Sequence, residues 1–89
     1  MKSIKFSPDF HKKLQILQRR DIKLFDKIQK QLELFKQNPR HKSLRLHKIT
    51  REVKNTWSIS IDKGYRMLYT ENGDFYFFKL GTHDEVYKK

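Results

Sequence analysis

The sequence predicts an α+β domain in which a pair of helices packs on one antiparallel sheet. Between residues 8 and 37, apolar side chains recur at spacings of three and four, which is the period of an α-helix. From residue 44 onward the period falls to two, which is typical of strands. A chain of 89 residues has room for one modest core, so we expect a single domain over residues 1–89.

The first twenty residues predict a strand followed by a helix. Residues 2–6 alternate between polar and apolar side chains, as in a short strand. Ser7 is a favourable N-cap and Pro8 suits the first helical position, so a helix is expected over residues 8–20.

A second helix is predicted over residues 22–37. Asp21 is a suitable N-cap, and Asn38-Pro39 ends the helix because the residue before a proline avoids the helical conformation. Because the two helices are joined so tightly, they should form an antiparallel hairpin. The apolar residues of the second helix recur at three, four and three: Phe25, Ile28, Leu32 and Phe35.

The second half of the chain predicts three or four antiparallel strands in one sheet. Residues 57–61 alternate, residues 65–70 and 75–80 are largely apolar, and Asn72-Gly73 is a strong hairpin signal between the last two strands. The helix pair should cover one face of this sheet and leave the other partly open. We expect the core to include Phe25, Ile28, Leu32 and Trp57.

The chain is strongly basic. It has 21 Lys and Arg against 10 Asp and Glu, a net charge of +11, which favours nucleic acid, an acidic protein or an anionic membrane as partner. No apolar run approaches the roughly 20 residues needed to span a membrane. The charge on the helices fits a solvated face, whereas the basic stretch 36–54 is expected to bind phosphate.

A few side chains are candidates for chemistry. Arg66 interrupts an otherwise apolar strand, so its charge needs a pocket or a partner, for which Asp62 and Glu85 are the alternatives. His83 and Tyr87 follow the last strand in a short polar tail, where they are either functional or ordinary surface and core-edge residues. With no Cys and no metal-ligand spacing among the four His, we expect no metal and no cofactor.

Three segments resemble the RelE/ParE superfamily of bacterial toxins. They are Trp57-Ser-Ile-Ser-Ile, Gly64-Tyr65-Arg66-Met67-Leu68-Tyr69 and Gly81-Thr82-His83-Asp84-Glu85-Val86-Tyr87. The resemblance covers nearly the whole chain. Residues 46–50 and the Gly-Thr-His segment are most similar to the YafQ branch, and Tyr65-Arg66 and Glu85-Val86-Tyr87 are similar to RelE itself.

The resemblance implies the toxin of a type II toxin–antitoxin system. Such a toxin is a ribosome-dependent mRNA endonuclease, or mRNA interferase, which cuts messenger RNA in the decoding site beside 16S rRNA. A cognate acidic antitoxin silences it in a hetero-oligomeric complex. Without an export signal or a membrane segment at the N-terminus, a cytoplasmic location is expected.

The resemblance also implies roles for individual residues. Arg66 matches the arginine that steadies the phosphate, His47 and His83 match catalytic histidines, and Tyr87 matches the aromatic residue that orients the nucleotide. These types suit metal-free attack by the RNA 2′-hydroxyl, which needs a base, an acid and a cation. The expected RNA and ribosome contacts are Lys42, Arg45, Lys48, Arg51 and Lys54.

The chain also departs from the family pattern. Ser58 and Ser60 stand where RelE-type members carry lysines, Ser60 also stands where YafQ-type members carry a histidine, and Gly64 replaces a YafQ-type Asp. The assignment of acid and base among the candidates therefore stays open. The alternative functions are a ParE-like inhibitor of DNA gyrase and a non-catalytic RNA-binding homologue.

Overall fold

The computed structural model describes residues 3–49 and 55–87, with the backbone alone described for Tyr87. Arg51 and Lys54, two of the predicted RNA contacts, lie outside the described residues. The elements are β1 (Ile4–Phe6), α1 (Pro8–Arg20), α2 (Ile22–Gln37), the short 3₁₀ helix η1 (Lys42–Leu44), β2 (His47–Ile49), β3 (Thr56–Ser60), β4 (Tyr65–Asn72), β5 (Asp74–Thr82) and α3 (His83–Tyr87).

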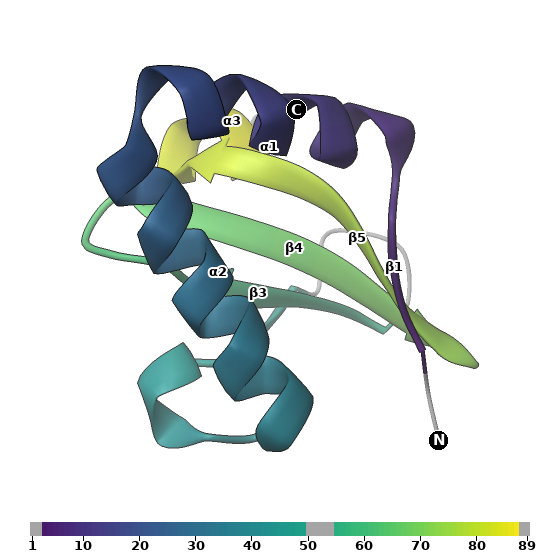
Figure 1. Ribbon diagram of the computed structural model, residues 1–89. Coiled ribbons are helices and arrows are strands. Elements are labelled where there is room, and N and C mark those ends of the chain that lie inside the picture. The colour runs from purple at the N-terminus through teal and green to yellow at the C-terminus, as the bar shows by residue number, and fades with distance from the viewer. Residues whose placement is uncertain (1–2, 50–54, 88–89) are drawn as a thin grey trace.

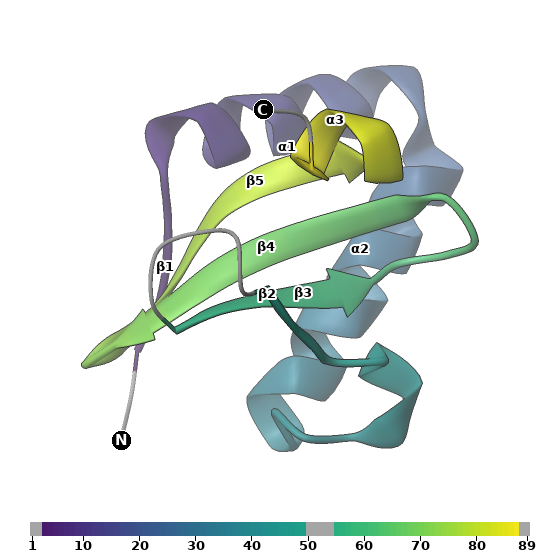
Figure 2. The same ribbon diagram turned by 180° about the vertical axis from the view of Figure 1, so that it is seen from behind.

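The five strands form one mixed sheet in the order β1-β5-β4-β3-β2. β1 runs parallel to β5, with Phe6 opposite Phe77, and the other neighbouring strands are antiparallel. α1 and α2 lie on one side of the sheet, and α3 lies on the other side (Figure 1 and Figure 2). The predicted α+β fold, with an N-terminal strand, a helix pair and an antiparallel set of strands, is confirmed.

Side-chain caps begin both long helices where the sequence predicts them. Ser7 Oγ accepts a hydrogen bond from the backbone N–H of Phe10 at 3.1 Å, and Asp21 Oδ1 accepts one from that of Leu24 at 3.2 Å. Asp21 alone separates α1 from α2, so the chain turns back at once. The result is a splayed hairpin, in which α2 diverges from α1 and crosses the sheet obliquely (Figure 1).

Among the described residues, no helix is both long and apolar enough to cross a membrane.

Aromatic side chains fill the space between the helices and the sheet. Phe35 of α2 is fully buried, and its ring meets those of Tyr69, Phe75 and Phe77 edge-on, with ring centroids 4.9–5.3 Å apart. Phe10 of α1 extends the cluster, with its ring centroid 5.8 Å from that of Phe77. Each such aromatic pair contributes about 0.5–1.5 kcal/mol beyond the burial of its area. Phe35 is therefore the centre of the core.

The predicted core is right for Ile28 and Leu32, partly right for Trp57 and wrong for Phe25. Ile28 and Leu32 are buried, whereas Phe25 and Trp57 are half-buried. The core-facing stripe of α2 includes Leu24 in place of Phe25, because Leu24 lies one turn before Ile28 on the same side of the helix. Trp57 packs against the core but borders a pocket near the short edge strand β2, so part of its ring stays exposed.

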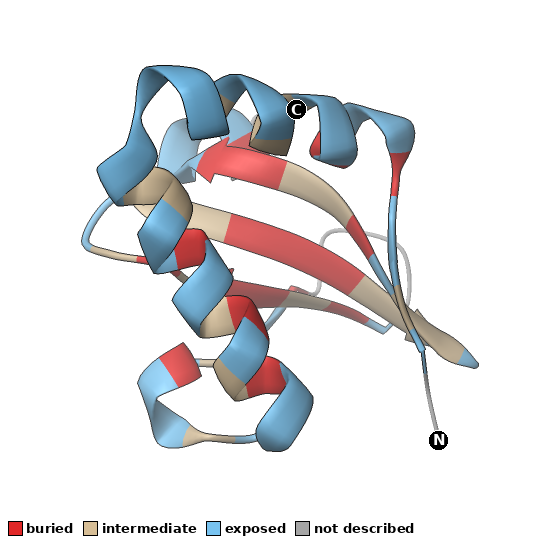
Figure 3. Ribbon diagram, viewed as in Figure 1, coloured by how far each residue is buried: buried red, intermediate tan, exposed pale blue. Residues whose placement is uncertain are grey.

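β4 lies at the centre of the sheet, and its alternating side chains belong to two surfaces. Met67 and Tyr69 pack with the core residues of α1 and α2, on what we call the helix-covered face. Arg66 and Leu68 point the other way, to what we call the open face, where Val86 of α3 packs with Leu68. Figure 3 shows that buried residues run through the middle of β4. The strand is thus buried from both sides, while each face carries different side chains.

Phe35→Ala is expected to lower the free energy of unfolding by about 3–5 kcal/mol, because it empties the centre of a packed aromatic cluster. Phe25→Ala is the matched control on the same helix, and it should cost clearly less because Phe25 is half-buried outside the core. Chemical denaturation followed by circular dichroism measures both losses. Equal losses for the two variants would contradict this description of the core.

Candidate active site on the open face

The C-terminal segment is a helix seated on the open face. The sequence interpretation of this segment as a polar tail is wrong, because Thr82 and Glu85 form a capping box that begins α3. Glu85 Oε1 accepts a hydrogen bond from the backbone N–H of Thr82 at 2.8 Å, and Thr82 Oγ1 accepts one from that of Glu85 at 3.3 Å. The Thr-x-x-Glu spacing is the sequence signal from which this helix start was predictable.

Gly81 allows α3 to lie close to β5. A Cβ atom added at Gly81 would lie 2.7 Å from Glu85 Oε1, 3.1 Å from Glu85 Cβ and 3.1 Å from Lys13 Nζ, so the side chains of Glu85 and Lys13 would have to move away. Lys13 Nζ itself lies 3.9 Å from Glu85 Oε1, so a cation from α1 reaches the capping carboxylate across the end of β5. α3 is therefore held by its own cap, by Gly81 and by α1.

Arg66 is a charged side chain on the open face, near the start of the central strand β4. On β4 it lies opposite Ser60 of β3 and opposite Gly81 of β5. The side chain is half-buried, and its Nε atom is buried without a hydrogen-bond partner. A buried donor without a partner is unfavourable by about 1–3 kcal/mol. Arg66 is thus ready to bind an acceptor that the described residues do not supply.

The two carboxylates that the sequence offers as partners for Arg66 are used elsewhere. Asp62 lies 3.5 Å from Lys27 Nζ, and its Oδ1 accepts hydrogen bonds from the backbone N–H groups of Gly64 and Tyr65. Glu85 caps α3 and faces Lys13, as described above. Within residues 3–49 and 55–87, neither carboxylate forms an ion pair with Arg66.

Ser58 is a second buried polar residue on this face. It lies between His47 of β2 and Leu68 of β4 in the sheet register, two residues along β3 from the position opposite Arg66. Its side chain is fully buried, and Oγ has no hydrogen-bond partner. Sequence reasoning noticed Ser58 only as the replacement of a lysine, and its burial follows from the sheet register.

The predicted catalytic residues lie on or beside the open face. His47 is exposed on the edge strand β2, two strands away from Arg66. His83 is exposed at the start of α3, where its backbone N–H donates to Gly64 O at 2.9 Å and its Nδ1 lies 3.7 Å from Asp84 Oδ1. Tyr87 ends α3, which lies over this face (Figure 2). The fold therefore gathers the four residues around one surface.

The predicted RNA contacts do not all belong to this surface. Lys42 lies in η1, Arg45 follows it in the left-handed conformation with φ 48°, and both are exposed. Lys48 lies opposite Trp57 and its Nζ is 5.8 Å from the centre of the Trp57 ring, on the helix-covered face. His47 and Lys48 are neighbours in sequence but point to opposite sides of β2, because side chains alternate along a strand.

Two groups near α3 have perturbed pKa values. The N–H of Thr82 and then the cation of Lys13 lower the pKa of the Glu85 carboxyl. Burial raises the pKa of Tyr65 to about 12, and the carboxylates of Glu85, Asp21 and Asp62 add to this. Tyr65 is therefore protonated at neutral pH and is unsuited to act as a base.

Comparison with known proteins identifies the fold. No family model and no curated protein matches the chain. The YoeB/ParE toxin from Agrobacterium tumefaciens matches with a TM-score of 0.77 and 17% identity, over 91% of this chain and 98% of that chain. YafQ from E. coli strain BL21(DE3) matches with a TM-score of 0.76 and 18% identity, over 98% of this chain and 99% of that chain. The chain has the RelE/ParE toxin fold.

A third structure with the RelE/ParE fold comes from a complex. It is the heterotetrameric YoeB-YefM toxin-antitoxin complex from Staphylococcus aureus, which matches with a TM-score of 0.76 and 21% identity, over 93% of this chain and 98% of that chain. The prediction of a RelE/ParE fold is thus confirmed. Among the motifs that suggested it, Tyr65-Arg66 begins β4 and Glu85-Val86-Tyr87 lies in α3, so these two stand at the same end of the sheet.

The pH dependence of α3 follows from the lowered pKa of Glu85. Because the pKa is lowered in the folded chain, the carboxylate stabilises α3 above its unfolded pKa, and this stabilisation is lost as the pH falls through the folded value. Lys13→Ala should raise the pKa of Glu85 only part of the way, because the Thr82 N–H, the largest cause, remains. An NMR titration of the Glu85 carboxyl measures this, and a complete return to the ordinary value would contradict the capping box as the main cause.

Proposed function

We propose that this chain is the toxin of a type II toxin–antitoxin pair and that it cuts messenger RNA on the ribosome. Its fold is shared with the YoeB/ParE and YafQ toxins. The observation that carries the proposal is Arg66, a half-buried guanidinium on the open face whose Nε has no hydrogen-bond partner. Arginine presents a rigid fork of donors that fits phosphate oxygens, so an RNA phosphate is the acceptor that satisfies it best.

The reaction that these residues suit is transfer of the phosphate to the neighbouring ribose. The RNA 2′-oxygen attacks the adjacent phosphorus, the bond to the 5′-oxygen breaks, and the products are a 2′,3′-cyclic phosphate and a 5′-hydroxyl. A base accepts the proton of the 2′-hydroxyl, and an acid gives a proton to the 5′-oxygen. A cation stabilises the negative charge that gathers on the phosphate oxygens in the transition state.

Each of the four candidate residues has a role in this scheme. Arg66 stabilises the phosphate charge, and His47 and His83 transfer the two protons, with the direction of each transfer left open. A histidine suits either transfer because its unperturbed pKa lies near neutral pH. Tyr87 orients the nucleotide by stacking or by its hydroxyl. Their positions around one sheet face support this division, since the RNA would lie across that face between β2 and α3.

The alternatives are a ParE-like inhibitor of DNA gyrase and a non-catalytic RNA-binding homologue. One observation favours them: the lysines expected in RelE-type members at two positions of β3 are Ser58 and Ser60 here, so the open face has fewer cations. A supercoiling assay with DNA gyrase identifies the first alternative. Binding to ribosomes without cuts identifies the second.

The proposed partner is an acidic antitoxin protein. The YoeB structure described above is part of a YoeB-YefM toxin-antitoxin complex, and the same kind of hetero-oligomer is proposed here. The net charge of +11 supports an acidic partner, because long-range electrostatic attraction would draw such a partner to this basic chain. Free of the antitoxin, the chain would act on ribosomes in the cytoplasm.

Arg66→Ala, His83→Ala and Tyr87→Ala should each slow cleavage of mRNA on programmed ribosomes by about 10²–10⁴, the usual cost of losing a positioned proton donor or charge stabiliser. The measurement is the single-turnover rate at saturating toxin, because a catalytic loss persists there whereas a binding loss does not.

Arg19→Ala is the matched control, since Arg19 is an exposed arginine in the last turn of α1. It should keep the full rate. The fold of every variant is checked by circular dichroism. If the His83→Ala, Tyr87→Ala double variant retained the full single-turnover rate, the nuclease site described here would be wrong.

A further inference from the structure

A pocket of about 260 Å³ lies on the helix-covered face, toward the β4–β5 turn and away from α3. Its walls come from β3, β4, β5 and the segment between α2 and β2. The lining residues are Asn38, Pro39, Arg40, Leu46, Trp57, Tyr69, Glu71 and Phe75. The function proposed above uses none of them.

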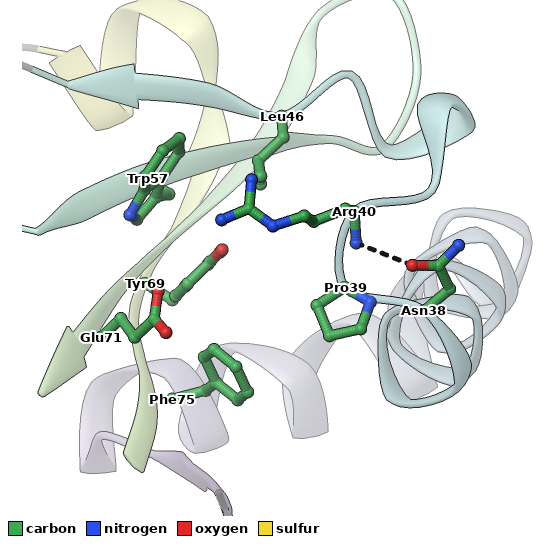
Figure 4. A pocket seen from close by; sticks show the side chains of 8 residues that line it. All are labelled: Asn38, Pro39, Arg40, Leu46, Trp57, Tyr69, Glu71 and Phe75. Atoms are coloured by element: carbon green, nitrogen blue, oxygen red, sulfur yellow. Dashed lines mark hydrogen bonds between the residues drawn. The ribbon is translucent and has the colours of Figure 1, made fainter. Parts of the chain in front are cut away.

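The lining combines flat aromatic rings with one guanidinium. Trp57 and Phe75 are half-buried, and Tyr69 is buried beneath them. The side chain of Arg40 extends across the pocket toward Trp57 and Tyr69, while its backbone N–H donates to Asn38 Oδ1 at 3.1 Å (Figure 4). Burial raises the pKa of Tyr69, with the Glu71 carboxylate adding to this and Arg40 opposing it, so both charges act on this ring.

Exposed cations surround the pocket on the side of β2. Arg40 lies on its rim, Lys42 and Arg45 lie in and just after η1, and Lys48 reaches over Trp57 with its Nζ 5.8 Å from the ring centre. Lys48 comes from β2, on the other side of β3 from Tyr69, and so does not line the pocket. The arrangement is an aromatic hollow beside cations, which is the combination that binds single-stranded nucleic acid.

The size and charge of the pocket restrict what fits. Its volume lies below the roughly 300–1,000 Å³ of pockets for drug-sized ligands, so it suits a single ring system. The lining carries one cation, Arg40, and one carboxylate, Glu71, so a neutral ring system suits it better than an anion does. An apolar side chain would make no use of the Arg40 guanidinium, which extends across the pocket. A nucleobase stacks on Trp57 and also offers acceptor atoms and a ring face to Arg40.

We propose that this pocket binds one unstacked nucleobase of single-stranded RNA, held between Trp57 and Arg40, while the neighbouring phosphates contact Lys42, Arg45 and Lys48. The choice of RNA rests on the function proposed above. The two surfaces meet at β2, where His47 points to the open face and Lys48 to the other. An RNA strand passing round this three-residue edge strand reaches both the cleaving surface and the pocket.

Trp57 is the only tryptophan of the sequence, so its fluorescence reports on the pocket. Titration with a short single-stranded RNA should quench it with a saturable curve. The same oligonucleotide with abasic sites carries the same phosphates and should quench little. Arg40→Ala should weaken the affinity seen by quenching about tenfold, as loss of one stacking partner does. Arg19→Ala is the matched control, and its affinity should be unchanged because Arg19 is an exposed arginine in the last turn of α1 and does not line the pocket.

Three results would overturn the proposal. They are equal quenching by the abasic oligonucleotide, an unchanged affinity in Arg40→Ala, and quenching by an acidic polypeptide but not by RNA. Arg40 is exposed, so its removal leaves the fold intact, and circular dichroism verifies this. Ribosome-dependent cleavage by the wild-type chain is measured in parallel. Cleavage without quenching rejects the pocket and keeps the nuclease, whereas quenching without cleavage keeps the pocket and rejects the nuclease.

Discussion

The pairing of β4 with β3 on one side and β5 on the other is the constraint on which the rest of the structure depends. It fixes the register across the sheet, so that Met67 and Tyr69 face the helices while Arg66 and Leu68 face the other way. A shift of one residue would exchange these sets and place a charged guanidinium in the aromatic core. The apolar packing around Phe35 therefore also determines where Arg66 stands.

The same constraint gives the two faces different chemical characters. The helix-covered face is largely apolar, because α1 and α2 exclude water from it, and the pocket with Arg40 and Glu71 lies at the C-terminal end of α2. Among the described residues, α3 is the helix on the open face, held by the Thr82–Glu85 capping box and by the close approach that Gly81 permits. Polar groups can therefore stay on this face, and two of them, Arg66 Nε and Ser58 Oγ, are buried without partners. Such groups are unfavourable for stability, and a bound phosphate would relieve the cost at Arg66.

Much of the fold was predictable because its signals are local. The caps at Ser7 and Asp21 and the apolar spacing set both long helices, and Asn72-Gly73 set the last hairpin, where Gly73 has a φ of 85°. The predictions that failed concern features that are set by contacts between distant segments. The face taken by Lys48 follows from its pairing with Trp57, and the orientation of α2 that favours Leu24 over Phe25 follows from the splay of the helices. For the site, the sequence predicted that Arg66 is a functional residue. The structure was needed to show that Arg66 Nε has no hydrogen-bond partner and that Lys48 and His47 lie on opposite faces of the sheet.

The proposed function requires the open face to promote attack by an RNA 2′-hydroxyl, and one measurement tests this directly. Two messengers that differ by a single 2′-O-methyl group, placed on the nucleotide at the cleavage position, are loaded on identical ribosomes and given the wild-type chain. We expect the unmodified messenger to be cut, leaving a 2′,3′-cyclic phosphate and a 5′-hydroxyl, and the methylated messenger to stay intact at that position. Equal cutting of both messengers, or a product ending in a 3′-hydroxyl, would contradict the account.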